Sequence, residues 1–488
     1  MTAPADRRPN LLLITTDQQR FDTIAAAGAR HMLTPNLDYL LESGVHFSRC
    51  YTDSPVCAPA RSTLLTGRHH HNNPPGIGHF NQPSTERPDL TLPAVLTRAG
   101  YQTASVGKLH AHPPRATYGY EFTEILEDYY RYMARHPHLG RPMAHGLGQN
   151  QMQPALATVD EAHSLTRWTV DRAIDFLETR DPTRPFFLHV GFSKPHPPFD
   201  PPLSYLLLYQ NRPLPEPIYG DWSADVERIH PGLLGPTWFL SGVDAFTPEL
   251  IRLARQAYFA LITHIDYTLG ALLARLRELE LLDTTHILFT SDHGEMLGDH
   301  HMGAKTTFLE PSAHVPMIYR PARGYGGDAL RPGSRCDALV CLADVYRTFT
   351  SAAGVAPPAE AAPDSLDLAA VAAGVARRDL LFGRCSNFHM ALTPRHKYIF
   401  HDTGAELLFD LEADPLERRN LTDSPDHGGV LETLRRSLAE LMLRTNYARA
   451  VKDGRPAGCI PVPDRRGVRA VSWPGHHSPD HTPHDVLH

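Results

Sequence analysis

A cysteine with an ordered set of neighbours is the residue of this chain best placed to do chemistry. Cys57 opens the run 57–61 (Cys-Ala-Pro-Ala-Arg), and Thr66-Gly67 follow five and six residues after the arginine. Ser62 and Thr63 precede two leucines, which predicts the start of a helix there. The cysteine would then lie near a helix N-terminus, where backbone N–H groups and the helix dipole favour an anion. The pattern therefore indicates a cysteine beside an anion-binding site, with a buried structural cysteine as the alternative.

Two acidic side chains follow buried strands that lie far apart in the sequence. The apolar run 10–15 predicts a parallel strand that delivers Asp17 at its carboxyl end, and the run 285–291 delivers Asp292-His293 in the same way. Ligands in open α/β sheets bind at the carboxyl ends of the strands. Each acid therefore lies where a ligand site is expected, and the alternative for Asp292-His293-Gly294 is a strand-ending turn with capping carboxylates.

The elements that must position these residues read as an α/β pattern. Thr34-Pro35 opens a predicted helix through Leu41 that Gly44 ends, and 185–191 is a further apolar strand. The longest helical pattern begins at Thr247-Pro248 and keeps apolar residues at helical spacing as far as Leu276. Strands that alternate with helices predict a mostly parallel sheet covered by helices on both faces.

The last quarter of the chain has a different pattern. Residues 356–367 are rich in Ala and Pro and predict a linker, after which 380–382, 397–400 and 406–409 read as short hairpin strands. A helix is expected from about Val430 to Leu443, and the residues after Asn446 show little periodicity. We therefore expect a large α/β domain over 1–365, a smaller C-terminal α+β domain with a short antiparallel sheet over 366–445, and an extended tail over 446–488.

Composition places the chain among globular proteins and narrows its partners. Its 488 residues are 42% hydrophobic and 21% charged, and the net charge of −7 gives no argument for a nucleic-acid partner. No apolar stretch suggests a membrane span, and no secretory leader is visible. The six cysteines include no Cys-x-x-Cys pair, so we expect no disulfide scaffold and a cytoplasmic location.

The run from Cys57 through Pro59 and Arg61 to Thr66-Gly67 resembles the signature of the type I sulfatases, in the alkaline-phosphatase-like superfamily. In that family a formylglycine-generating enzyme oxidises the cysteine to Cα-formylglycine, whose hydrate is the nucleophile. The resemblance extends from about Pro9 to Asn420. It implies a large α/β domain followed by a smaller domain with a short antiparallel sheet.

The same resemblance implies a site for one divalent cation. Asp17, Gln18, Cys57 (as formylglycine), Asp292 and His293 fall on the positions of the family's ligands. Ca²⁺ is favoured, with Mn²⁺ and Mg²⁺ as alternatives. The chain departs from the common pattern at Gln18, where an acid is usual, so the site loses one negative charge. This combination is similar to that of the choline-sulfatase and phosphonate monoester hydrolase branches.

Basic residues complete the implied catalytic set. Gly107-Lys108-Leu109-His110 resembles the family's Gly-Lys-x-His element, and the segments around His196 and Lys305 resemble two others. Arg61 and Lys108 would hold the formylglycine and the sulfuryl oxygens, and Lys305 and His196 would stabilise or protonate the leaving alcohol. His110 would take the second hydroxyl proton. Each residue alone could be a solvated surface charge, and only their joint, ordered occurrence favours a site.

The function implied is hydrolysis of sulfate esters of small molecules or carbohydrates to an alcohol and inorganic sulfate. Two alternatives stay open: a phosphonate or phosphate ester hydrolase on the same scaffold, and a non-catalytic anion-binding relative with unmodified Cys57. The alcohol is undetermined, since aryl, alkyl, choline and sugar esters all fit. By resemblance, we expect a homodimer or tetramer in which the tail reaches a neighbouring subunit. The run His69-His70-His71 we interpret as a solvated loop rather than a metal site.

Overall fold

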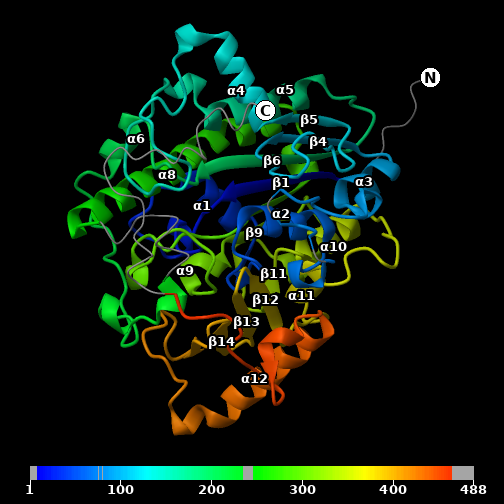
Figure 1. Cartoon of the computed structure of the whole chain (residues 1–488). Coiled ribbons are helices and arrows are strands. Elements are labelled where there is room, and N and C mark those ends of the chain that lie inside the picture. Colours follow the sequence, from blue (N-terminus) through cyan, green and yellow to red (C-terminus); the bar gives the residue numbers. More distant parts are fainter. Residues whose placement is uncertain (1–7, 75, 80, 235–245, 464–488) are drawn as a thin grey trace.

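An eight-stranded sheet forms the centre of the protein (Figure 1). The computed structural model describes residues 8–74, 76–79, 81–234 and 246–463. The strand order is β10-β2-β9-β7-β1-β6-β4-β5. In chain order the strands are β1 (Asn10–Asp17), β2 (Val45–Phe47), β4 (Gln102–Gly107), β5 (Phe122–Ile125), β6 (Phe186–Pro195), β7 (Thr285–Ser291), β9 (Met317–Arg320) and β10 (Ser334–Cys336).

The sheet is mostly parallel, with β1 near its middle. β1 pairs in parallel with β6 on one side and β7 on the other, and of these eight strands β9 runs against its neighbours. A second, three-stranded sheet has the order β11-β3-β8. Its strands are β3 (Cys50–Tyr51), β8 (His314–Val315) and β11 (Val340–Cys341). The predicted α/β class is therefore confirmed.

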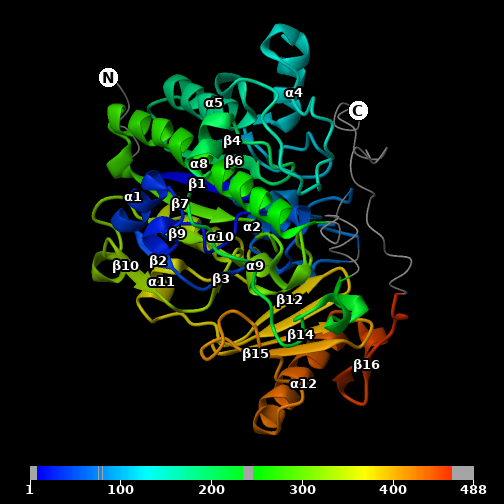
Figure 2. The ribbon, with the colours of Figure 1, turned by 90° about the vertical axis from the view of Figure 1, so that its left-hand side faces the viewer.

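Helices cover both faces of the central sheet (Figures 1 and 2). Alternate β1 side chains point to opposite faces, so Leu12 and Ile14 pack in one core and Leu11 and Leu13 in another. The first core includes α1 (Pro35–Ser43), α5 (Leu165–Thr179) and α8 (Pro248–Glu278). The second includes α2 (Cys57–Thr66), α3 (Leu92–Arg98), α10 (Asp344–Ala352) and α11 (Leu368–Ala372). The remaining helices of this part are α4 (Leu126–Arg135), α6 (Leu203–Leu208) and α9 (Glu310–Ala313).

The central helix α8 confirms the long helical pattern, and its apolar length has a second reading. By length and apolar composition alone α8 could cross a membrane, with a mean hydropathy of 1.3 in its most apolar window. However, 78% of that window is buried inside the protein, against α5, α6, α1 and β6. This burial is that of a core helix, whose apolar surface is already covered.

The C-terminal part forms a four-stranded antiparallel sheet packed against one helix (Figure 2). The sheet contains β12 (Leu381–Cys385), β13 (Phe388–Leu392), β14 (His396–His401) and β15 (Glu406–Asp410), and α12 (Gly428–Arg444) covers one face. The three predicted strands and the helix are confirmed, whereas β13 was missed. The proposed boundaries at 365 and 445 stay a prediction. After α12, the short strands β16 (Val451–Lys452) and β17 (Arg455–Pro456) pack near that helix, and residues 464–488 of the predicted tail lie outside the described residues.

The small sheet is bonded to the loop that precedes the candidate nucleophile. The backbone N–H of Arg384 in β12 donates to the carbonyl of Asp53 at 2.9 Å. The fully buried ammonium of Lys397, in β14, lies 2.5 Å from Glu310 and 2.9 Å from Glu417. Hydrogen bonds and ion pairs therefore join the two parts of the chain close to Cys57.

Two local expectations were wrong. The helix predicted at Ser62 begins at Cys57, so Cys57 is its first residue. Pro59 does not prevent this, because the first-turn N–H groups of a helix have no intrahelical partner to lose. The run of histidines from His69 to His71 is buried rather than solvated, with residues 4–8% exposed, because it packs between α2 and the small sheet.

Candidate active site

Strand register brings the two predicted acids together. β1 and β7 are parallel, and Thr16 pairs with Ser291, so Asp17 and Asp292 leave the sheet side by side. Both carboxylates are fully buried. A buried pair of like charges is unfavourable unless cations or hydrogen-bond donors compensate it, so this edge of the sheet must be built around positive charge.

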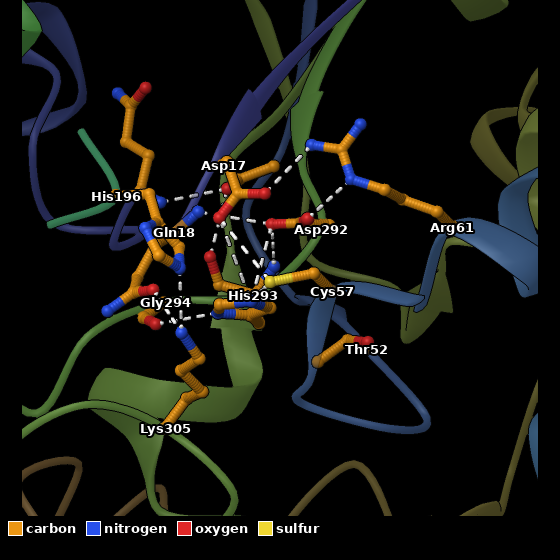
Figure 3. A network of polar contacts seen from close by, with 12 residues as sticks. Asp17, Gln18, Thr52, Cys57, Arg61, His196, Asp292, His293, Gly294 and Lys305 are labelled. Carbon is orange, nitrogen blue, oxygen red and sulfur yellow. Dashed lines mark hydrogen bonds and ion pairs between the residues drawn. The ribbon is translucent and has the colours of Figure 1, made fainter. Parts of the chain in front are cut away.

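Cys57 points its sulfur into the space between these acids and His293 (Figure 3). Its Sγ lies 3.1 Å from His293 Nε2 and 3.6 Å from Asp17 Oδ1. His293 Nδ1 lies 3.0 Å from the carbonyl of Gly294, which can only accept, so Nδ1 carries the proton. The Nε2 lone pair therefore faces the cysteine. Burial lowers the pKa of His293, which keeps that lone pair available.

Arg61, one turn along α2, holds both carboxylates. Its Nε donates to Asp292 at 2.8 Å, Nη2 donates to Asp17 at 3.2 Å, and Nη1 donates to the carbonyl of Lys108 at 2.6 Å. The Lys108 ammonium lies 2.8 Å from the same Asp17. Lys108 follows Gly107, which adopts a left-handed backbone conformation with φ of 83°. A Cβ added to Gly107 would lie 2.2 Å from the carbonyl oxygen of Gly191, so no side chain fits there. The glycine thus lets β4 and β6 close up and places Lys108 over Asp17.

On the opposite side of the cluster, Lys305 connects three polar side chains. Its Nζ donates to Gln18 Oε1 at 2.6 Å, to His196 Nε2 at 3.1 Å and to Asn150 Oδ1 at 3.3 Å. His196 Nδ1 lies 2.8 Å from the carbonyl of Pro197, so Nδ1 carries the ring proton and Nε2 accepts from Lys305. Burial, reinforced by Lys305, holds the pKa of His196 well below its usual range.

His110 lies at the mouth of the cluster rather than inside it. Its side chain is exposed and its backbone is left-handed, with φ of 52°. It lines a cavity of about 210 Å³ together with Ala58, Lys108, Glu127 and Gln149. This cavity lies beside the first turn of α2, through Ala58.

Neighbouring charges separate the proton affinities of the two acids. Burial alone would raise the pKa of Asp17, but the charges of Lys108 and Arg61 outweigh it and hold that pKa well below the ordinary value. Burial together with the charge of Asp17 raises the pKa of Asp292. For the thiol, burial and Asp17 raise the pKa of Cys57 to about 12, so with these neighbours alone the encoded side chain is a neutral thiol.

The donor set fits a divalent cation. Ligand atoms of Asp17, Cys57, Asp292 and His293 all lie within 4.8 Å of one another. Ca²⁺–oxygen distances are about 2.3–2.6 Å, so two atoms on one ion lie at most roughly 5 Å apart. Two carboxylates, an imidazole lone pair and the nearby Gln18 Oε1 are donors of the kind that hard and borderline dications take.

Comparison with known proteins agrees with this geometry. Residues 9–355 match the family model named Sulfatase. The chain belongs to the sulfatase family. It is 32% identical over 472 residues to an arylsulfatase of Clostridium perfringens, an alignment that covers 88% of this chain and 94% of the relative. It is 30% identical over 447 residues to a choline-sulfatase of Rhizobium meliloti, with 86% and 83% covered.

Solved structures agree on the fold of this sulfatase. The phosphonate monoester hydrolase of Agrobacterium radiobacter superimposes with a TM-score of 0.74 at 24% identity, covering 93% of this chain and all of that one. Because the family model and the named relatives are sulfatases, the enzyme class is that of the sulfuric ester hydrolases.

The structure gathers every predicted site residue except His110 into one buried cluster, and His110 lines the adjoining cavity. Figure 3 labels these clustered residues apart from Lys108. Two residues in the cluster were missed. Asn150 contacts Lys305 from a loop, and Glu295 accepts a hydrogen bond from the Gln18 amide. In the sequence, Glu295 could have been noticed only because it lies close after Asp292-His293. Its role becomes visible only in its contact with Gln18.

Proposed function

We propose that this sulfatase hydrolyses sulfate monoesters to an alcohol and inorganic sulfate, with residue 57 as formylglycine beside a divalent cation. The supporting observation is the direction of Cys57. Its sulfur lies within 4.8 Å of ligand atoms on Asp17, Asp292 and His293, in a buried space otherwise occupied by charged and polar groups. A structural cysteine acts as a small apolar side chain, whereas the groups nearest this sulfur are carboxylates and an imidazole.

The modification supplies the chemistry that the encoded thiol lacks. A cysteine sulfated on sulfur has no second group to expel the sulfate. A hydrated aldehyde has two hydroxyls, so one can attack the ester sulfur and the other, once deprotonated, can expel sulfate and restore the aldehyde. The cation held by Asp17, Gln18, Asp292 and His293 would supply positive charge to the sulfuryl oxygens and to the attacking hydroxyl.

Arg61 and Lys108 divide the positive charge on the carboxylate side. Three directions of the Arg61 guanidinium are occupied by Asp292, Asp17 and the Lys108 carbonyl, which supports a role in fixing the cation's carboxylate ligands. The Lys108 ammonium pairs with Asp17 and also borders the open cavity. It is therefore the better placed of the two to meet a sulfuryl oxygen.

Lys305 and His196 serve the leaving alcohol. Lys305 donates to His196 Nε2, so a proton can be held between these two nitrogens and given to the oxygen that leaves. His110, at the mouth of the cavity, would accept the proton of the second hydroxyl when sulfate departs. The alcohol would extend into the cavity of about 100 Å³ that Lys108, Gln149 and His196 line, because this cavity borders the proposed proton donor.

The cation proposed is Ca²⁺, on the strength of the two carboxylates and the amide oxygen, with Mn²⁺ or Mg²⁺ as alternatives. Sulfate esters are preferred to phosphonate esters on family grounds. The absence of charge on Gln18 favours some activity toward phosphorus esters, because phosphate monoesters carry nearly two negative charges and sulfate monoesters one. Values of kcat/KM for p-nitrophenyl sulfate, phenyl phosphonate and phosphate esters, compared side by side, should place sulfate first.

The test begins with residue 57 itself. Protein co-expressed with a formylglycine-generating enzyme should show the formylglycine mass in the peptide around residue 57, and turnover of p-nitrophenyl sulfate should scale with that fraction. Cys57→Ala should abolish turnover while the thermal unfolding temperature stays close to the parent's. Full activity in Cys57→Ala, or in protein with no modified residue 57, refutes the proposed nucleophile. An unmodified residue 57 together with no turnover of any test ester favours the non-catalytic anion-binding alternative.

A further inference from the structure

The backbone of Gln18 is fixed before its side chain is considered. Gln18 is fully buried and adopts a left-handed conformation with φ of 72°, which is uncommon for a residue other than glycine. Its N–H donates to Asp292 at 3.1 Å, and its carbonyl accepts from the Tyr258 hydroxyl at 2.7 Å. A strained conformation held from both sides is typical of functional positions. The remaining freedom is which end of the side-chain amide faces the cation cluster.

Glu295 decides that orientation. Its side chain is fully buried; Oε1 accepts from the Leu297 N–H at 2.9 Å, and Oε2 accepts from Gln18 Nε2. A carboxylate only accepts hydrogen bonds, so it draws the NH₂ end of the amide toward itself. The Gln18 oxygen is thereby turned the other way, toward the Lys305 ammonium on the cluster side (Figure 3).

We propose that Glu295 is a positioning residue for the cation site, acting through Gln18. It presents the Gln18 oxygen to the cation. Its carboxylate also supplies the negative charge that an acid at position 18 would have placed directly on the ion, but it supplies this charge through the hydrogen bond to Gln18. The inference rests on the cation assigned under the proposed function. The loop after β7 would then supply two ligands, Asp292 and His293. It would also support a third ligand, Gln18, which directly follows β1 and lies 277 residues before Glu295 in the sequence.

A simpler role for Glu295 is to cap its own turn through the Leu297 N–H. The two roles differ in what they predict for Glu295→Gln. A glutamine offers one acceptor oxygen, and if Leu297 keeps it, the new NH₂ group faces Gln18 and requires the Gln18 oxygen. The Gln18 amide then turns over and presents its own NH₂ group to the cation, which weakens binding. Turn capping alone predicts no change in cation affinity.

The experiment measures the Ca²⁺ dissociation constant of the full-length protein by calorimetry, with the unfolding temperature in EDTA recorded for every variant. Loss of a supporting hydrogen bond at a metal ligand typically costs 10–100-fold in affinity. Glu295→Gln should therefore bind Ca²⁺ about 10–100-fold more weakly. Glu280→Gln, the same change at an exposed glutamate, should bind as the parent does.

Reciprocal exchange gives the sharper result. In the double variant Q18E/E295Q a carboxylate at position 18 accepts from the NH₂ group introduced at position 295, while its other oxygen faces the cation. Its affinity should return to within about threefold of the parent, although E295Q alone is weak. If Glu295 acts only through Gln18, Q18A/E295Q should bind no more weakly than Q18A, because coupled residues are not additive.

The outcomes separate this inference from the proposed function. Parent-like affinity in E295Q overturns the positioning role, and so does a double exchange that stays as weak as E295Q, or additive losses in Q18A/E295Q. If E295Q does not fold, the Ca²⁺ affinities of Q18E/E295Q, Q18A and Q18A/E295Q test the positioning role without it. A parent protein that binds neither Ca²⁺ nor Mn²⁺ refutes the cation site, and this inference with it, whereas sulfatase activity and residue 57 are scored by their own assays.

Discussion

Arg61→Lys tests how much of the site depends on a single guanidinium. Arg61 makes three hydrogen bonds, to Asp292, to Asp17 and to the Lys108 carbonyl, at 2.8, 3.2 and 2.6 Å. Its side chain is 5% exposed, and both acids are fully buried. A lysine keeps the charge, but its single ammonium cannot span two carboxylates and a carbonyl in the way a planar guanidinium does. We expect one contact to survive and two to be lost.

Hydrogen bonds to charged groups contribute about 1.5–3 kcal/mol each, so the loss of two costs at least about 3 kcal/mol. At about 1.4 kcal/mol per tenfold, that lowers kcat/KM by at least about 100-fold if the arrangement of the carboxylates matters for turnover. The assay is kcat/KM on p-nitrophenyl sulfate, normalised to the formylglycine fraction by peptide mass, because Arg61 belongs to the sequence that the modifying enzyme is expected to recognise. Arg68→Lys, just beyond α2, is the matched control. A normalised kcat/KM within about fivefold of the parent would contradict this account.

Three further predictions concern the metal, the pH dependence of stability and assembly. Asp292→Ala should lower bound metal and activity together, and plasma emission analysis that finds full metal in an inactive variant would contradict the ligand assignment. Burial raises the pKa of Asp53 to about 7 from 3.8, so the folded state holds this proton more tightly and the stability it contributes is lost as pH rises from about 4 to 7. Asp53→Asn should therefore gain unfolding temperature relative to the parent between about pH 5 and pH 8, and a constant difference would refute the shift. Truncation after Leu443 should reduce particle mass in light scattering if the tail joins subunits, and unchanged mass would remove that role.

Local patterns were sufficient where a residue's role depends on the element that carries it. Asp17 and Asp292 were each predicted at the carboxyl end of an apolar strand, and the parallel pairing of β1 with β7 brings those ends together. The start of α2 was predicted late, because Ser62 and Thr63 before two leucines resembled a helix start, although the helix already contains Pro59 in its first turn. β13 was missed because residues 388–392 include no β-branched residue and only one aromatic residue, so their composition does not favour a strand. Such errors move element boundaries and leave the site in place.

Contacts between distant segments could not be predicted in the same way. Nothing in the sequence near Glu295 shows that its partner is Gln18, 277 residues earlier, because that pairing depends on how β1 and β7 lie in the sheet. The burial of His69 to His71 likewise comes from the small sheet, whose strands begin more than 300 residues later. A histidine run looks solvated by composition alone. Its actual surroundings are set by tertiary packing.

The hydrogen bond from Arg384 to Asp53 has a consequence for the order in which the protein folds. Because residue 384 is synthesised more than 300 residues after Cys57, the loop before the nucleophile gains this backbone partner only when the chain is nearly complete. Residues 1–365 made alone would leave that loop and the Glu310 side chain without their partners in the small sheet. On the ribosome, this leaves an interval in which the Cys57 segment has been made but not yet enclosed. For the oxidation proposed above, that interval is when a second enzyme can reach the thiol.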